Sequence, residues 1–233
     1  MATILHIETS TEACSVTVSQ DGATIFQIED LSGHAHAQKL GGFVDQAMSF
    51  TDNHGIPFDA VAISSGPGSY TGLRIGVSMA KGVCYAQNLK LLAVPTLKLL
   101  CTPVLLGKEE LPEDALLCPM IDARRMEVYC VLYNRALKEQ MPVQPVVVDE
   151  NFLADTLQQH PVYFFGNGAE KCKTVLTHPN AHFIDTIIPH AKNMCPLAEM
   201  AFLREEYEDV AYFEPFYLKE FQAKIPKSPL AGL

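Results

Sequence analysis

One stretch, from Val61 to Cys84, constrains the fold more than any other part of this 233-residue chain. It begins with the apolar, β-branched run Val61–Ser65, which is typical of a buried strand. Gly66-Pro67-Gly68 follows as a turn, and Ser69 or Thr71 can cap a helix of about four turns. A glycine turn at a helix N-terminus can hold an anion. Gly66, Gly68 and Ser69 are therefore candidate cleft residues, although such turns more often only shape a loop.

The helix expected after this turn carries a stripe of small side chains at every fourth position. The stripe comprises Gly72, Gly76, Ala80 and Cys84, with Ile75, Met79 and Val83 beside it. Because each glycine inside a helix costs roughly 1 kcal/mol relative to alanine, a closely packed neighbour is expected against this face. That neighbour is either the chain's own sheet, which is the commoner case, or a helix of another subunit.

Composition excludes several classes of protein. Hydrophobic residues make up 48% and charged residues 19% of the chain, which is an ordinary globular balance. The formal net charge of −10 argues against the protein gripping nucleic acid unaided. No apolar run has the length of a membrane span, and the start of the sequence has no export signal. Seven cysteines without any CxxC pair favour reduced thiols in a cytoplasm over disulfides or a zinc site.

Both halves of the chain predict the same order of elements. In the first half we expect strands at 3–8, 14–19 and 23–29, a helix at 35–51, a strand at 61–65, a helix at 71–87 and a strand at 89–94. In the second we expect strands at 116–121, 127–133 and 143–148, a helix at 150–159, a strand at 162–165, a helix at 169–177 and a strand at 182–188, then a last helix from 196 to about 209. Each half thus follows the order β-β-β-α-β-α-β, which predicts an α/β fold with mixed sheets. Residues 95–115 are expected to join the halves.

Acidic residues at strand ends are the first candidates for chemistry. Glu8 and Asp122 end the first strand of each half and could face one cleft, where they would bind Mg²⁺ beside nucleotide phosphates. Neither is followed closely by a glycine. Arg124 and Arg125, just after Asp122, could clamp a carboxylate or phosphate or could simply be exposed. The histidines match no metal-ligand spacing, and no serine lies in a hydrolase motif, so no constellation forms a self-sufficient active site.

Several blocks across the chain together are similar to one known family. They are Ile4–Val18, His36–Gln38, Ser65–Gly76, Val94–Leu97, Ile121–Arg124 with Glu127–Tyr129, and Glu214–Leu218. In these blocks the chain resembles the TsaB family, bacterial partner proteins in the synthesis of threonylcarbamoyladenosine beside the anticodon of tRNA. Glu8 stands where an aspartate is more usual in that family.

The resemblance implies a duplicated actin-like ATPase (RNase H-like) fold. Its parts would be an N-terminal, partner-binding subdomain at 1–100, a C-terminal subdomain at 101–213 and an extended tail at 214–233. The larger relative TsaD carries out the transfer and holds a metal with a His-x-x-x-His motif. The two histidine places fall here on Thr96 and Leu100, and a leucine cannot bind a metal. We therefore expect no catalytic residue, no metal, and at most weak binding of ATP and Mg²⁺ in the cleft.

The resemblance also implies partners. The chain would pair with TsaD as a non-catalytic subunit, form a homodimer when alone, join the small ATPase TsaE in a larger complex, and meet tRNA only through that complex. The predicted partner interface comprises Leu40, Val44, Gly72, Ile75, Gly76, Met79, Ala80 and Val83. A large residue at Gly76 is expected to abolish pairing while leaving the monomer folded.

Two alternatives remain open from the sequence. One is an ATP-dependent phosphotransferase of the sugar-kinase type, which would need Glu8, the Gly66–Gly68 turn and Asp122 to cradle Mg-ATP. Magnesium-dependent nucleotide binding by the isolated protein would favour it. The other is a glycoprotease-like peptidase, for which the chain offers no nucleophile–base pair and no metal motif.

Overall fold

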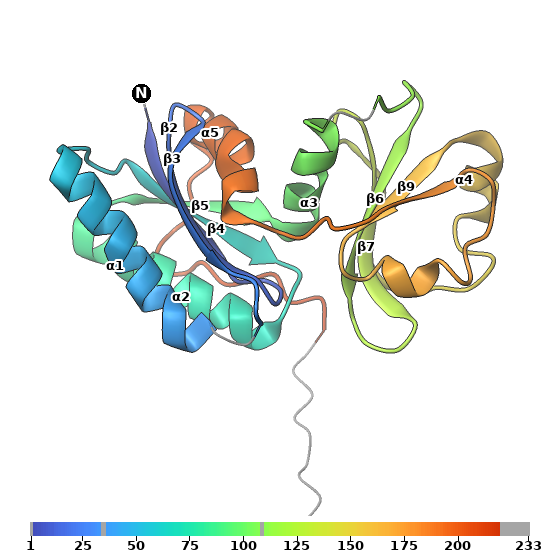
Figure 1. Ribbon diagram of the computed structural model, residues 1–233, viewed down its shortest axis with the longest axis horizontal. Coiled ribbons are helices and arrows are strands. Elements are labelled where there is room, and N and C mark those ends of the chain that lie inside the picture. Colours follow the sequence, from blue (N-terminus) through green and yellow to red (C-terminus); the bar gives the residue numbers. More distant parts are fainter. Residues whose placement is uncertain (1, 34–35, 108–109, 220–233) are drawn as a thin grey trace, which may run out of the picture.

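Two five-stranded sheets lie side by side in the computed structural model, which describes residues 2–33, 36–107 and 110–219 (Figure 1). The part of the predicted tail after residue 219 lies outside the described residues. The first half contains β1 (Thr3–Glu8), β2 (Cys14–Gln20), β3 (Ala23–Asp30), α1 (His36–His54), β4 (Ala60–Gly66), α2 (Tyr70–Gln87) and β5 (Lys90–Pro95). Its sheet order is β3-β2-β1-β4-β5, antiparallel through β3, β2 and β1 and parallel through β1, β4 and β5.

The second half repeats this arrangement. After α3 (Thr96–Leu105) come β6 (Leu116–Asp122), β7 (Glu127–Asn134), β8 (Glu139–Val147), α4 (Ala154–Gln159), β9 (Val162–Phe165), the 3₁₀ turn η1 (Glu170–Cys172) and β10 (Ala181–Ile184). The sheet order β10-β9-β6-β7-β8 is that of the first sheet, element for element. The predicted duplicated actin-like ATPase (RNase H-like) fold, with two mixed sheets, is confirmed.

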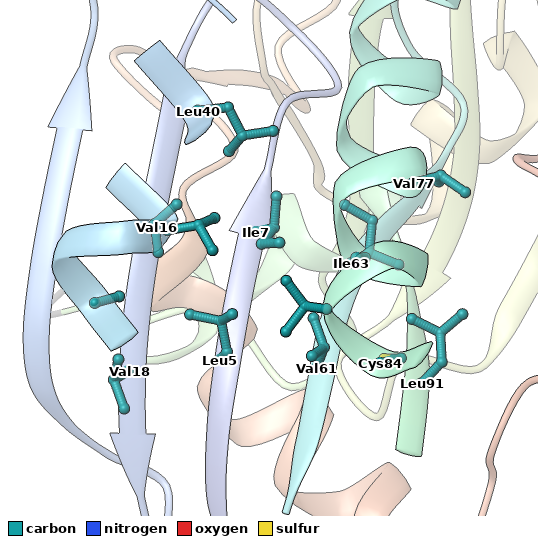
Figure 2. Packing of buried hydrophobic residues seen from close by; sticks show 14 of the residues in the cluster. Leu5, Ile7, Val16, Val18, Leu40, Val61, Ile63, Val77, Cys84 and Leu91 are labelled. Carbon is teal, nitrogen blue, oxygen red and sulfur yellow. The ribbon is translucent and has the colours of Figure 1, made fainter. Parts of the chain in front are cut away.

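The main core lies between the first sheet and the two long helices. Figure 2 shows Leu40 of α1 and Val77 and Cys84 of α2 facing Leu5, Ile7, Val16, Val18, Val61, Ile63 and Leu91 of the sheet. Burying each such aliphatic side chain contributes about 1.5–3 kcal/mol. Because side chains alternate along a strand, Leu5 and Ile7 of β1 enter this core while His6 and Glu8 point to the opposite face.

The helices of the second half differ from the prediction. The segment 95–115, expected only to join the halves, contains α3, whose Leu97, Leu100 and Val104 form one apolar face against the second sheet. The helix predicted at 150–159 begins only at Ala154, and the one predicted at 169–177 is reduced to η1. The run Lys173–Thr177 contains three β-branched residues, which lower helix propensity.

The chain returns to the first half after β10. The 3₁₀ turn η2 (Ala191–Met194) and helix α5 (Cys195–Leu203) pack Met194 and Ala198 against Ile4 and Leu92, on the face of the first sheet opposite α1 and α2. The predicted boundaries of 1–100 and 101–213 stay a prediction, although α5 falls in the second of these ranges and packs on the first sheet. The second sheet ends at Ile184, and η2 and α5 pack on the first sheet.

The segment that leads from α5 into the tail is also tied to the first half. The Glu208 N–H donates to the Leu91 carbonyl at 2.9 Å, and Lys81 Nζ of α2 donates to the carbonyls of Ala211 and Phe213 at 3.0 and 3.1 Å. The tail then crosses to the second half, where Lys219 pairs with Glu127 of β7. Its described part is therefore an ordered strap that links both sheets.

The seven cysteines are free and buried, in keeping with the predicted reduced thiols. None of the helices within residues 2–33, 36–107 and 110–219 combines the length and the apolar character that a bilayer crossing requires. The cytoplasmic location stays a prediction.

Candidate functional site

The glycine turn between β4 and α2 is covered by the tail. Gly66 has a positive φ of 110°, and a Cβ on it would lie 2.6 Å from the carbonyl oxygen of Phe216. The Phe216 N–H donates to the Ser65 carbonyl at 2.7 Å, and the Gly66 N–H donates to Thr96 Oγ1 at 3.2 Å. The backbone groups that a phosphate would use at Gly66 are therefore engaged by the chain itself.

The other two candidates in this turn contact the loop that follows β1. A Cβ on Gly68 would overlap the carbonyl oxygen of Ser10. The Ser69 N–H donates to that same oxygen at 2.6 Å, while Ser69 Oγ accepts from the Gly72 N–H at 3.3 Å. Ser69 is thus the N-cap of α2, as one reading of the sequence predicted.

Glu8 is fully buried at the end of β1. Its Oε1 accepts the Ser10 N–H at 2.5 Å. Burial raises the pKa of the Glu8 carboxyl to about 7, and hydrogen bonds from Ser10 and Ser64 oppose that shift only in part. Because Glu8 is enclosed in this way, its carboxyl holds the loop after β1 in place. A magnesium ligand would instead need to face an open cleft.

Asp122, at the corresponding place in the second half, has an exposed side chain. Its carboxylate binds the ammonium of Lys171, which also donates to the Glu127 carbonyl at 2.6 Å. The Asp122 N–H donates to Asn167 Oδ1 at 3.0 Å. Within the described part of the chain, no hydrogen bond or ion pair joins Glu8 to Asp122, and no group of three or more His, Cys, Asp and Glu residues is arranged to hold a metal.

The two places that correspond to the metal-binding histidines of TsaD are packed in the interior. Thr96 is fully buried and accepts the Gly66 N–H through its hydroxyl. Leu100 belongs to the apolar cluster formed by α3 and the second sheet. Thr96 thus links α3 to the glycine turn of the first half, and Leu100 packs α3 on the second sheet.

The small-residue stripe of α2 faces inward, which corrects part of the predicted partner interface. Cβ atoms on Gly72 and Gly76 would overlap Thr9, and the one on Gly76 would also lie 3.0 Å from Ile63 Cδ1. Thr9 Oγ1 donates to the Gly72 carbonyl at 2.8 Å. The predicted contact residues Leu40, Val44, Gly72, Gly76, Ala80 and Val83 are all buried within the monomer. A large residue at Gly76 would therefore disturb the packing of the monomer itself, and the expectation that the monomer stays folded remains a prediction.

A groove between α1 and α2 lies on the outer side of the same helices. Its volume is about 830 Å³. It is lined by Ala37, Met48, Arg74, Ile75, Ser78, Met79, Gly82, Val83, Ala86 and Gln87. Ile75, Met79 and Val83 were among the predicted contacts, whereas Ser78, Gly82 and Ala86 were missed. Their spacing of four residues was visible in the sequence, as a second stripe parallel to the one chosen.

Comparison with known proteins gives a consistent assignment. The family model for TsaD, tRNA N6-adenosine threonylcarbamoyltransferase, matches residues 30–227. A Bacillus subtilis protein named tRNA threonylcarbamoyladenosine biosynthesis protein TsaB is 30% identical, with 95% of this chain and 96% of that protein covered. The protein of the same name from Escherichia coli is 28% identical over 93% of this chain and 94% of its own length.

A solved structure agrees. A crystal structure from Pseudomonas aeruginosa, described as an uncharacterized protein with similarity to peptidase YeaZ, matches with a TM-score of 0.75 and 27% identity, covering 94% of this chain and all of that one. The sequence blocks, the duplicated fold and these matches over most of the length of both proteins lead to one conclusion: the chain belongs to the TsaB family, within the wider family that the TsaD model describes.

Proposed function

We propose that this protein is a subunit for the synthesis of threonylcarbamoyladenosine in tRNA, without catalytic activity of its own, and that it pairs with TsaD. The relatives named TsaB support the pathway. TsaD would move the threonylcarbamoyl group to the tRNA adenosine, and this chain would hold TsaD in a competent state.

One observation supports the non-catalytic part of this proposal. At the positions where a nucleotide or metal would bind in the cleft, other residues of the chain are already bound or packed. The Phe216 carbonyl covers Gly66, the Lys171 ammonium binds Asp122, and Leu100 stands at the second histidine place. A lysine at a carboxylate supplies the charge that Mg²⁺ would otherwise supply. The chain therefore shares the fold of TsaD, while its own side chains and backbone occupy the positions that ligands would use.

The groove between α1 and α2 is the surface that we propose for TsaD. Ile75, Met79 and Met48 give it an apolar floor, and Gly82 lets a neighbouring backbone approach closely. Since TsaD has a related fold, its equivalent helices could pack here in a pseudo-symmetric pair. The same groove would serve a homodimer when TsaD is absent, so the two assemblies would compete. TsaE would then join the pair.

Gly82→Arg tests this surface. Nothing lies within 4 Å of a Cβ on Gly82, so the monomer accepts the side chain while the groove is filled. We expect the affinity for TsaD to fall about thirtyfold or more, because an arginine in the centre of an apolar contact costs on the order of 2 kcal/mol. Size-exclusion chromatography with light scattering, on the chain alone and mixed with TsaD from the same source, measures both assemblies.

Gly42→Arg is the matched control. Gly42 lies on α1 with nothing within 4 Å of a built Cβ, and it is not part of the groove lining. It should pair as the wild type does. Equal pairing by the two variants would place the interface elsewhere, and the absence of any species of summed mass with the wild type, even with ATP and TsaE present, would refute the partnership itself.

A further inference from the structure

A band of basic and aromatic side chains runs along the edge where the two halves meet. It comprises Arg74 and Tyr70 of α2, Tyr217 and Lys219 of the tail, Lys171 of η1, and Arg124 and Arg125 in the turn between β6 and β7. We call these residues the basic band. Figure 1 shows the described end of the tail between the first half and the second sheet. Its five cations lie among three carboxylates, those of Asp122, Glu127 and Glu214, so the basic band has a net positive formal charge on a chain whose formal charge is −10.

The first part of the basic band is a stack between α2 and the tail. The Arg74 guanidinium lies 5.0 Å from the centre of the Tyr70 ring, and the rings of Tyr70 and Tyr217 are 4.8 Å apart. Tyr70 and Tyr217 are half-buried and hold one another and Arg74 in place, so the part of this stack that remains exposed is pre-organised for contact with a planar group.

The second part joins the tail to the second sheet. Lys219 pairs with the Glu127 carboxylate, and Lys171 pairs with Asp122 and donates to the Glu127 carbonyl. The two lysines therefore neutralise the two carboxylates that flank the β6–β7 turn. The charges of Arg124 and Arg125 remain uncompensated there, because no ion pair is recorded for either guanidinium among residues 2–33, 36–107 and 110–219.

The turn between β6 and β7 holds both arginines in an unfavourable backbone conformation. Arg124 and Arg125 are both exposed and both have left-handed backbone conformations, with φ of 71° and 53°. Glycine or asparagine adopts this conformation at much lower cost. Residues other than glycine that are held in this conformation are found more often at sites where side chains bind a ligand or partner.

We propose that the basic band is an RNA contact surface, in which Arg124 and Arg125 bind phosphates and Tyr70 and Tyr217 offer rings for stacking. Cations that alternate with aromatic rings fit single-stranded or loop RNA, since the cations follow the backbone while bases stack on the rings. The inference rests on the proposed function in one respect, namely that the RNA is the tRNA substrate of the complex. It adds a direct contact by this subunit, beside the contact made through TsaD.

Fluorescence anisotropy of a labelled tRNA tests the proposal, with the chain alone at low salt and with the TsaD complex over a range of salt concentrations. The variant is Arg124→Asn with Arg125→Asn, because asparagine tolerates left-handed backbone and removes the charge. Loss of two phosphate contacts should weaken binding about tenfold and lower the slope of log affinity against log salt by about 1.5. Arg124→Lys with Arg125→Lys should retain most of the affinity.

The matched control removes the same charge elsewhere. Arg135, in the turn after β7, and Arg204, after α5, are exposed arginines outside the basic band. If Arg135→Asn with Arg204→Asn weakens tRNA binding as much as the band variant does, the effect is one of net charge and the proposal fails. It also fails if the band variant binds tRNA as the wild type does.

If that variant instead lowers the affinity for TsaD in light scattering with tRNA binding unchanged, the arginines recognise protein carboxylates. Pairing with TsaD is measured separately, so its failure would refute the proposed partnership and leave the RNA result standing.

Discussion

Gly76→Val should destabilise the monomer by about 2–4 kcal/mol. The new side chain would overlap Thr9 Oγ1 and press on Ile63 Cδ1, which is held in the centre of the first sheet. Overpacking of this kind typically costs about 1–3 kcal/mol, and displacing Thr9 would also break its hydrogen bond to the Gly72 carbonyl, for about 1 kcal/mol more. Unfolding in urea or guanidinium, followed by circular dichroism, measures the loss as a lower midpoint.

Gly82→Val provides the comparison on the same helix. A Cβ at Gly82 meets nothing within 4 Å, and replacing a helical glycine with valine gains about a few tenths of a kcal/mol, since valine is β-branched and a weaker helix former than alanine. This variant should therefore unfold at or slightly above the wild-type midpoint. If both valine variants unfolded at that midpoint, α2 would not be packed on Thr9 as described. The pair also shows why a loss of TsaD binding by a Gly76 variant would not locate an interface, because the monomer itself would be disturbed.

The sequence predicted the architecture well because most strands and helices have a clear hydrophobic pattern in their own residues. The strand expected at 61–65 and the helix at 71–87 appear as β4 and α2, displaced by one residue at each start. The repeated order of elements gave the duplication without detectable identity between the halves. The prediction was less accurate for the second half, where tertiary packing overrides local propensity. The helix expected at 169–177 is only η1, and α3, which packs on both sheets, was missed because Pro103 lies inside it.

The candidate site was harder to predict, because the spacing of small residues along a helix does not show which side of that helix packs on the sheet. Gly76 and Gly82 look alike in the sequence, yet the first touches Thr9 and the second faces open space. The cleft posed a similar problem. Nothing near Gly66 in the sequence indicates that Phe216, far along the chain, covers it, or that Lys171 binds Asp122. Long-range contacts of this kind appear only in the folded chain.

Glu8→Gln should remove a pH-dependent cost of folding. The pKa of the Glu8 carboxyl is raised from 4.5 to about 7 by burial, so the folded state binds a proton that the unfolded state releases between these values. Stability from this group is therefore complete below pH 4.5, falls as pH rises towards 7, and is lost above it. A difference of that size corresponds to roughly 3 kcal/mol. Glutamine keeps the oxygen that accepts the Ser10 N–H and cannot ionise.

The measurement is the free energy of unfolding of both proteins at several pH values from 4.5 to 8, taken as a difference at each pH. The difference is needed because His6, on the same face of β1, acts in the opposite direction. Burial lowers the pKa of His6 from 6.5 to about 3, so its contribution to stability grows as pH rises to 6.5 and partly masks Glu8 in the wild-type profile. Relative to the wild type, Glu8→Gln should gain about 3 kcal/mol between pH 4.5 and 8. Exposed Glu139→Gln gives the background effect of removing one carboxylate. A difference for Glu8→Gln that did not change with pH would mean that Glu8 ionises in the folded protein as it does in the unfolded chain, and that the loop after β1 admits water to it.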